Sequence, residues 1–117
     1  MLNFYEAPAD EVSPGHFVIK ICDGNGICAS YHRILPGCSV PDKDFILHDN
    51  DEIVFVLRGQ GIATYPDKNY SMRRELAFYN PSGTPHKYWN NSQEELQLMV
   101  FYAADSIDVV RTEKKEY

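Results

Sequence analysis

Short stretches rich in β-branched and aromatic residues recur along the whole chain. Clusters of Gly, Pro, Asn, Asp and Ser, which are typical of turns, separate them. The stretches are HFVIKIC, ICASYHRIL, EIVFVL, IATY, LAFY, HKYW and LQLMVFYA. No segment carries the sustained 3.6-residue apolar repeat of an amphipathic helix. Strands at intervals of roughly 8–12 residues therefore predict an all-β fold, either a sandwich or a barrel.

A first group of polar residues surrounds the acidic turn at 49–51, in the stretch LHDNDEIVFVLRGQG. Alternate residues of a strand face the same side, so Asp44, Ile46 and His48 are expected to share one face of the strand that enters this turn. Glu52 opens the strand that leaves it. A tight hairpin can bring His48 and Glu52 together on the concave side of a barrel.

A second group follows the proline-glycine turn in NPSGTPHKYWN, residues 80–90. The strand after this turn carries His86, Tyr88 and Asn90 at alternate positions, so these side chains are expected on one face. If His86 points inward, the barrel interior holds two imidazoles and one carboxylate.

Composition narrows the class of protein. The chain has 117 residues, which suits a single domain over residues 1–117, with a barrel core at about 15–103 between short terminal extensions. A net charge of −6 argues against nucleic acid or an anionic membrane as a partner, because both need a basic face. The apolar runs are too short to span a bilayer, and the N-terminus does not have the pattern of a secretory signal.

Three cysteines, Cys22, Cys28 and Cys38, form no CxxC pair. We interpret them as free thiols in a reducing compartment, and we predict a cytoplasmic protein. Because Cys22 and Cys28 flank a turn, a disulfide between them is geometrically open as an alternative.

The two polar groups together resemble the cupin family. Its first motif is a Gly, five residues, H-x-H, three or four residues, E, six residues, G; its second is a Gly, five residues, P-x-G-x2-H-x3-N. Here His48-x3-Glu52-x6-Gly59 fits the back half of the first motif. Pro81-x-Gly83-x2-His86-x3-Asn90 fits the second through to its end. The resemblance implies a double-stranded β-helix, also called a jelly-roll barrel. It also implies a metal held by three histidines and a glutamate, and often a homodimer.

Three positions depart from the family pattern. Ile46 stands where the family has its first histidine, so one usual ligand is absent. Eight residues separate Gly37 from Ile46 where the family has five, and Glu75 replaces the glycine that opens the second motif. The last two departures alter loops at the rim, whereas the first alters the chemistry.

The remaining set, His48, Glu52 and His86, is predicted to hold one divalent transition metal, namely Fe, Mn, Ni or Zn. Two imidazoles and a carboxylate leave coordination positions open to water, dioxygen or a chelating substrate. Asp44 and His32 are possible additional ligands or substrate contacts, although a rim residue and a hydrogen-bonded wall residue are the favoured interpretations. Ile46 and Tyr88 are possible substrate contacts too. Glu52 and Tyr88 are weak candidates for a catalytic acid or base.

These predictions favour a metal-dependent enzyme, dioxygenase-, isomerase- or lyase-like, that acts on a small polar metabolite inside the barrel. One alternative is a non-catalytic cupin that binds a small molecule or a sugar as a sensor. Another is a metal-free isomerase or epimerase that uses His and Tyr as an acid-base pair. The presence of a bound metal discriminates between them. A homodimer is expected from the habit of the fold and from the N-terminal stretch NFYEAPADEVSPG, which could add to a partner's sheet.

Overall fold

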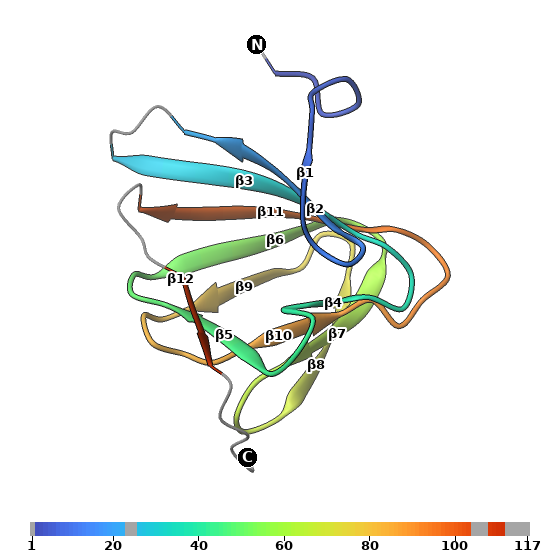
Figure 1. Cartoon of the computed structure of the whole chain (residues 1–117). Coiled ribbons are helices and arrows are strands. Elements are labelled where there is room, and N and C mark those ends of the chain that lie inside the picture. The colour runs from blue at the N-terminus through green and yellow to red at the C-terminus, as the bar shows by residue number, and fades with distance from the viewer. Residues whose placement is uncertain (1, 23–25, 104–107, 112–117) are drawn as a thin grey trace.

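The computed structural model describes residues 2–22, 26–103 and 108–111, and these residues form twelve β-strands and no helix (Figure 1). The strands are β1 (Asp10–Ser13), β2 (His16–Ile21), β3 (Ile27–Ile34), β4 (Ser39–Val40), β5 (Phe45–His48), β6 (Glu52–Arg58), β7 (Gln60–Thr64), β8 (Asn69–Arg73), β9 (Ala77–Asn80), β10 (Lys87–Trp89), β11 (Leu96–Ala103) and β12 (Asp108–Arg111). None of the described residues belongs to a helix long and apolar enough to cross a membrane.

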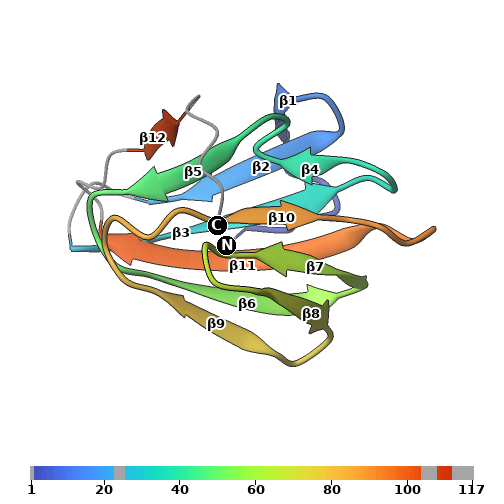
Figure 2. The same cartoon turned by 90° about the horizontal axis from the view of Figure 1, so that it is seen from below.

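The strands form three antiparallel sheets. The largest has six strands in the order β1-β2-β3-β11-β6-β9, and a second has four in the order β4-β10-β7-β8. Strands β5 and β12 pair with each other. A β-bridge between Ile46 and His86 joins the β5 ribbon to the start of β10. Seen from below, β5, β4, β10, β7 and β8 form a layer over the six-stranded sheet (Figure 2), the arrangement of a jelly roll. The predicted all-β jelly-roll barrel is confirmed.

The alternation of apolar residues along the strands determines which face is inside. In β6, Glu52, Val54 and Val56 are buried, whereas Ile53 and Phe55 between them are exposed. The inward residues of several strands pack into one apolar cluster, which stabilises the fold by removing apolar surface from water. Its buried members are Ile34, Val54, Val56, Ala63, Met72, Tyr88, Leu96, Leu98 and Val100.

Two glycines allow the tight turn between β6 and β7. Gly59 has φ +89°, and a Cβ there would lie 2.5 Å from the backbone oxygen of Glu95. A Cβ on Gly61 would lie 2.6 Å from the backbone oxygen of Trp89. Both positions therefore need a residue without a side chain.

Glu75 lies where the family pattern has a glycine, and its backbone conformation is one that favours glycine. Its φ is +74°, in the left-handed region that L side chains rarely adopt. The Glu75 amide donates a hydrogen bond to the Val56 carbonyl oxygen at 3.0 Å, which keeps this turn against β6. The chain retains the conformation although it lacks the glycine.

Cys22 and Cys28 form a disulfide, so the expectation of free thiols is wrong for these two residues. The ends of β2 and β3 lie side by side because these strands pair antiparallel, and the two Cα atoms are 4.8 Å apart. That separation lies within the range that a disulfide requires. Cys38 is a free thiol, half-buried beside the apolar cluster.

The N-terminal segment packs on the chain's own sheet. Strand β1 pairs with β2, and the Phe4 ring stacks on Tyr31 with centroids 4.3 Å apart. The segment thus contributes an edge strand to the six-stranded sheet, and that edge is the place where a partner strand could add.

Candidate functional site

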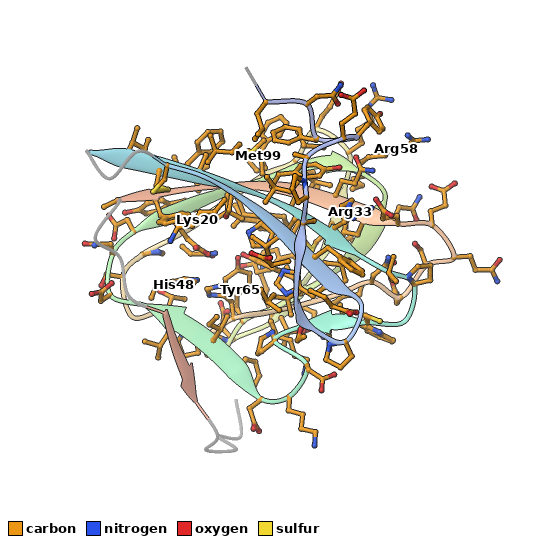
Figure 3. The ribbon with its side chains drawn as sticks, turned by 45° about the horizontal axis from the view of Figure 1, so that its top comes forward. Lys20, Arg33, His48, Arg58, Tyr65 and Met99 are labelled. Atoms are coloured by element: carbon orange, nitrogen blue, oxygen red, sulfur yellow. A yellow bond between two sulfur atoms is a disulfide. The ribbon has the colours of Figure 1, made fainter. Side chains whose placement is uncertain are left out.

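A cavity of about 510 Å³ lies between the two layers of the barrel. Apolar side chains that include Val18, Ile34, Ile46, Leu98 and Val100 form much of its wall. Two groups of its polar side chains are linked by short contacts, one around Glu52 and one around His32, and Lys20 and Asp42 line it as well. The side chains of His48 and Tyr65 lie inside the barrel (Figure 3).

The first group brings together the three predicted metal ligands. His48 is the last residue of β5, Glu52 is the first of β6, and His86 immediately precedes β10. His48 Nε2 lies 3.0 Å from Glu52 Oε2, and His86 Nε2 lies 3.2 Å from Glu52 Oε1. One ligand atom from each residue lies within 4.8 Å of the other two, so these residues could hold one metal ion.

Glu52 is ionised in this setting. Burial by itself raises the pKa of this carboxyl, since only 4% of the residue is exposed. Hydrogen bonds with His48 and His86, together with the charges of the two imidazoles, outweigh burial and hold its pKa well below the usual range. A carboxylate rather than a carboxylic acid therefore faces the two imidazoles, as metal ligation requires.

Asn80 holds the carboxylate from behind. It is the cross-strand partner of Glu52 between β6 and β9, and only 1% of it is exposed. Its Nδ2 donates hydrogen bonds to Glu52 Oε1 at 2.9 Å and to Tyr88 Oη at 2.7 Å, and its Oδ1 accepts one from Tyr65 Oη at 2.5 Å. Every polar group of the buried amide is engaged, which orients Glu52 toward the imidazoles.

The turns that carry the two histidines are tied to each other. Asp51 accepts hydrogen bonds from the Tyr79 hydroxyl at 2.6 Å and from the Ser82 amide at 2.8 Å. The Gly83 amide donates to the His48 carbonyl oxygen at 2.8 Å. The acidic turn and the proline-glycine turn therefore form one unit, and this unit fixes His48 relative to His86.

The donor set fits a transition metal. His86 Nδ1 donates a hydrogen bond to the Thr84 carbonyl oxygen at 2.9 Å, so Nε2, the atom that faces Glu52, is the one that would offer its lone pair to a metal. Two ligands at about 2.1 Å from one metal and at right angles lie about 3.0 Å apart. The two nitrogen-to-oxygen distances at Glu52, each to a different carboxylate oxygen, are close to that separation.

Ile46 lies beside His48, Glu52 and His86, the metal trio, and contributes backbone hydrogen bonds rather than a metal ligand. Its amide donates to the His86 carbonyl oxygen at 3.0 Å, and the His86 amide donates to the Ile46 carbonyl oxygen at 2.9 Å. The Ile46 side chain lines the cavity. The side of the site where the family pattern has a histidine is therefore apolar.

The other predicted residues fall at different places. His32 lines the cavity but forms hydrogen bonds with Ser30 and His16, so it is the wall residue that we favoured. Asp44 is absent from the cavity wall; its φ of +60° breaks the strand alternation just before β5. Tyr88 lines the cavity, and burial raises the pKa of its hydroxyl well above the usual value, so it stays protonated at neutral pH.

Sequence reasoning did not identify Asn80, Tyr65, His16 or Ser30 as site residues. Asn80 belongs to a segment interpreted as a turn, although its place directly before Pro81 is a usable signal. Ser30 and His32 have the alternate spacing of one strand face, which is a second signal. Nothing in the sequence marks Tyr65 or His16, because their contacts depend on strand register.

The comparisons with known proteins agree with this architecture. A family model described as a cupin domain matches residues 30–102. Among solved structures, the polyketide cyclase RemF from Streptomyces resistomycificus superposes with a TM-score of 0.84 at 14% identity, over 99% of this chain and 87% of that one. Salicylate 1,2-dioxygenase from Pseudoaminobacter salicylatoxidans, in a structure with gentisate, superposes with a TM-score of 0.75 at 16% identity.

That dioxygenase alignment covers 94% of this chain but 32% of the dioxygenase, so the chain spans about a third of its length. Among curated proteins, none matches this chain in sequence. At these identities the structural likeness shows the fold alone, whereas the family model matches well over half of the chain. The chain belongs to the cupin family.

Proposed function

We propose that this protein is a metal-dependent cupin enzyme that acts on a small molecule held inside the barrel. The observation that carries the proposal is the convergence of His48, Glu52 and His86 at the wall of the cavity. Two imidazoles and a carboxylate from three different strand ends meet there in a donor set that suits Fe, Mn, Ni or Zn.

A metal held by this trio would act as a Lewis acid on a substrate oxygen or as a centre for oxygen chemistry, because three protein ligands leave coordination positions open. The chain's own residues prepare the site. Asn80 orients the Glu52 carboxylate, and the Thr84 carbonyl fixes the His86 tautomer. Ile46 and Val100 keep the adjoining wall apolar, which limits access of water to the substrate.

The cavity favours a substrate that is largely apolar and carries oxygen functions. Its volume of about 510 Å³ lies within the range of sites for drug-sized molecules. Two solved structures with this fold are named as a polyketide cyclase and as a dioxygenase with gentisate, and these names agree with an oxygenated carbon skeleton. We therefore propose a reaction of the cyclase, isomerase, lyase or dioxygenase type.

One observation favours a second candidate, a metal-free cupin. Glu52 contacts both imidazoles and Asn80, so with a proton on Nε2 of each imidazole the carboxylate accepts hydrogen bonds from all three residues and needs no ion. In that case the pocket would bind a polar ligand as a sensor, or act on it by acid-base chemistry as an isomerase or epimerase.

The two candidates separate on metal content. We expect tag-free protein purified from cells to hold close to one transition-metal ion per chain, measured by elemental analysis. The His48→Ala/His86→Ala double variant should hold less than about a tenth of that amount, since it loses two of three ligands. The identity of the metal would then discriminate between oxygen chemistry and Lewis-acid chemistry.

The matched control is the His32→Gln variant, which changes a histidine in the same cavity wall that lies outside the trio. It should keep the metal content of the parent. If the parent takes up no metal after anaerobic reconstitution with Fe(II), Mn(II), Ni(II) and Zn(II), the metalloenzyme proposal is wrong and the metal-free candidate stands.

A homodimer and a cytoplasmic location remain predictions, and we propose the outer face of the six-stranded sheet as the dimer interface. Phe101, Ile53 and Tyr79 lie in one cross-strand row on that face, and each is more than a third exposed. Such a row is costly to leave in water. Sedimentation equilibrium should give twice the monomer mass, and Phe101→Glu should halve it; a monomeric parent contradicts the proposal.

A further inference from the structure

A second polar group lines the cavity at some distance from the metal trio, and the proposed function does not use it. Ser30 Oγ lies 2.7 Å from His32 Nε2, and His32 Nδ1 lies 2.8 Å from His16 Nε2. Ser30 is 4% exposed and His16 is 6% exposed. All three residues line the cavity, so the hydrogen-bonded chain of Ser30, His32 and His16 forms part of its wall.

The register of the strands places Ser30, His32 and His16 at a distance from the metal trio. Ser30 on β3 pairs with Val100 on β11, and Val100 pairs with Val54 on β6, two residues along the strand from Glu52. Two strand spacings and two residues place the Cα atoms of Ser30 and Glu52 roughly 12 Å apart. Both side chains point into the same cavity. A molecule of about two fused rings could therefore reach from one group to the other.

The hydrogen bonds among Ser30, His32 and His16 can form without a charge on either imidazole. Burial lowers the pKa of His16 from 6.5 to about 4, so His16 is neutral at neutral pH. With both imidazoles neutral, the protons of these three side chains have two arrangements. In one, the Ser30 hydroxyl donates to His32 Nε2, and His32 Nδ1 donates to His16. In the other, His16 donates to His32 Nδ1, and His32 Nε2 donates to Ser30 Oγ.

The two arrangements give the Ser30 hydroxyl opposite roles toward the cavity. In the first, Ser30 Oγ has a lone pair free to accept a hydrogen bond from a ligand hydroxyl. In the second, its own proton is free to be donated to a ligand carbonyl. The exchange needs no net charge, so the wall suits both the enol and the keto form of one oxygen.

An unpartnered atom lies at the same end of the cavity. Ser13 Oγ is buried and, within the part of the chain that the structure describes, has no hydrogen-bond partner. Ser13 is the cross-strand partner of His16 and also lines the cavity. A buried hydroxyl without a partner costs stability unless a ligand or water engages it.

We propose that Ser30, His32 and His16 form a second ligand-binding site that takes an uncharged hydroxyl or carbonyl oxygen of the substrate. The substrate class is then a molecule with an oxygen donor, such as a carboxylate, at the proposed metal and a neutral oxygen at its far end. The inference rests on the proposed function only for the carboxylate end.

Three two-ring probes test this site. 2-Naphthoate has no far oxygen, 6-hydroxy-2-naphthoate has a neutral one, and 2,6-naphthalenedicarboxylate has a charged group there. We expect calorimetric titration of the metal-loaded protein to show the hydroxy acid binding roughly three- to tenfold more tightly than 2-naphthoate, the range for one net hydrogen bond. The dicarboxylate tests the effect of Lys20, which also lines the cavity and is the cross-strand partner of Ser30. A dicarboxylate that binds more tightly than the hydroxy acid would show that this end takes an anion and would overturn the inference.

The Ser30→Ala variant should abolish the advantage of the hydroxy acid and leave the affinity for 2-naphthoate unchanged. Ser71→Ala is the matched control, because Ser71 is an exposed serine on β8 that does not line the cavity. It should behave as the parent. An equal affinity of the parent for the hydroxy acid and 2-naphthoate, or an advantage that survives in Ser30→Ala, would overturn the inference.

Two further measurements keep the proposals separate. If removal of the metal does not change the affinity for 2-naphthoate, the carboxylate end is wrong, while the hydroxyl advantage still tests Ser30. In the ligand-free protein, ¹⁵N shifts of the His16 and His32 side chains should show neutral imidazoles at pH 7. An imidazolium at either residue would contradict a neutral chain, whatever the probes do.

Discussion

Two pairs of histidines face one cavity, and they differ in what they contact and in how the fold holds them. The rings of His48 and His86 are 5.2 Å apart and share the Glu52 carboxylate. The rings of His16 and His32 are 5.0 Å apart, contact each other directly and end at the Ser30 hydroxyl. A carboxylate between two imidazoles suits a cation, whereas a hydroxyl at the end of two imidazoles suits a neutral ligand.

The supports of the two pairs differ as well. His48 ends β5 and His86 precedes β10, so turns tied through Asp51 position them. Ser30 and His32 lie within β3, where pairing with β2 and β11 positions them. Hydrogen bonds between two turns therefore fix the first pair, whereas the strand ladder fixes the second. A change in the turns should then disturb the first pair and leave the second in place.

The largest expected effect comes from removing the charge that distinguishes the two pairs. Glu52→Gln keeps the shape of the side chain but replaces the carboxylate by an amide. Metal affinity should fall by more than about 100-fold, because changes to groups behind the ligands already cost 10–100-fold. Titration against a competing chelator measures it. His32→Gln, which alters the other pair, should leave the affinity within a factor of about two. An equal loss in both variants would erase the contrast.

The second expected effect is a loss of stability at low pH that arises from His16, a member of the other histidine pair. The unfolded chain protonates His16 near pH 6.5, but the folded protein does so only near pH 4. The folded state therefore binds fewer protons between these values, and stability is lost as the pH falls from 6.5 to about 4. At pH 5 the loss from this residue is about 2 kcal/mol.

Urea unfolding of parent and His16→Gln at pH 7 and pH 5, with a chelator present, measures this difference. The parent should lose about 2 kcal/mol more free energy of unfolding than the variant between the two pH values. His32, which faces His16 from β3, is unchanged in both proteins. Equal losses would show that His16 is charged in the fold and that the two pairs are alike.

The third effect sharpens the contrast by adding a fourth ligand to the proposed metal site. Ile46 lines the cavity and pairs through its backbone with His86, where the family pattern has a histidine. Ile46→His should raise metal affinity about tenfold, or about 1.4 kcal/mol, by adding a fourth ligand. Val18→His on β2, which lines the cavity beside His32, is the control and should have no such effect. An unchanged affinity in Ile46→His would mean that position 46 does not face the ion.

The sequence predicted the convergence of His48, Glu52 and His86 but not that of His16, His32 and Ser30, for a physical reason. His48 and Glu52 are four residues apart around one turn, so local chain geometry brings them together. His16 and His32 are sixteen residues apart, and they meet only because β2 and β3 pair in one register. Register depends on the whole sheet, so no local pattern gives it. Asp44 shows a second limit of sequence reasoning. Its own left-handed backbone interrupts the strand alternation that predicted its side chain on the same face as Ile46 and His48.

The smallest effect tests whether the turns support only the trio. Asp51→Ala removes the two hydrogen bonds that Asp51 accepts from Tyr79 and Ser82. Both lie in exposed positions, so the urea midpoint of unfolding should change little. Metal affinity should fall a few-fold, roughly two- to fivefold, because His48 and His86 lose part of their mutual alignment.

The matched control for this last change is Asp67→Ala, in the exposed turn between β7 and β8. It should alter neither metal affinity nor probe binding. The advantage of 6-hydroxy-2-naphthoate over 2-naphthoate should survive in Asp51→Ala, since the ladder that holds Ser30 and His32 does not include this turn. If Asp51→Ala reduces that advantage as much as it reduces metal affinity, the two pairs share one support. They would then respond to ligands as a single site rather than as two.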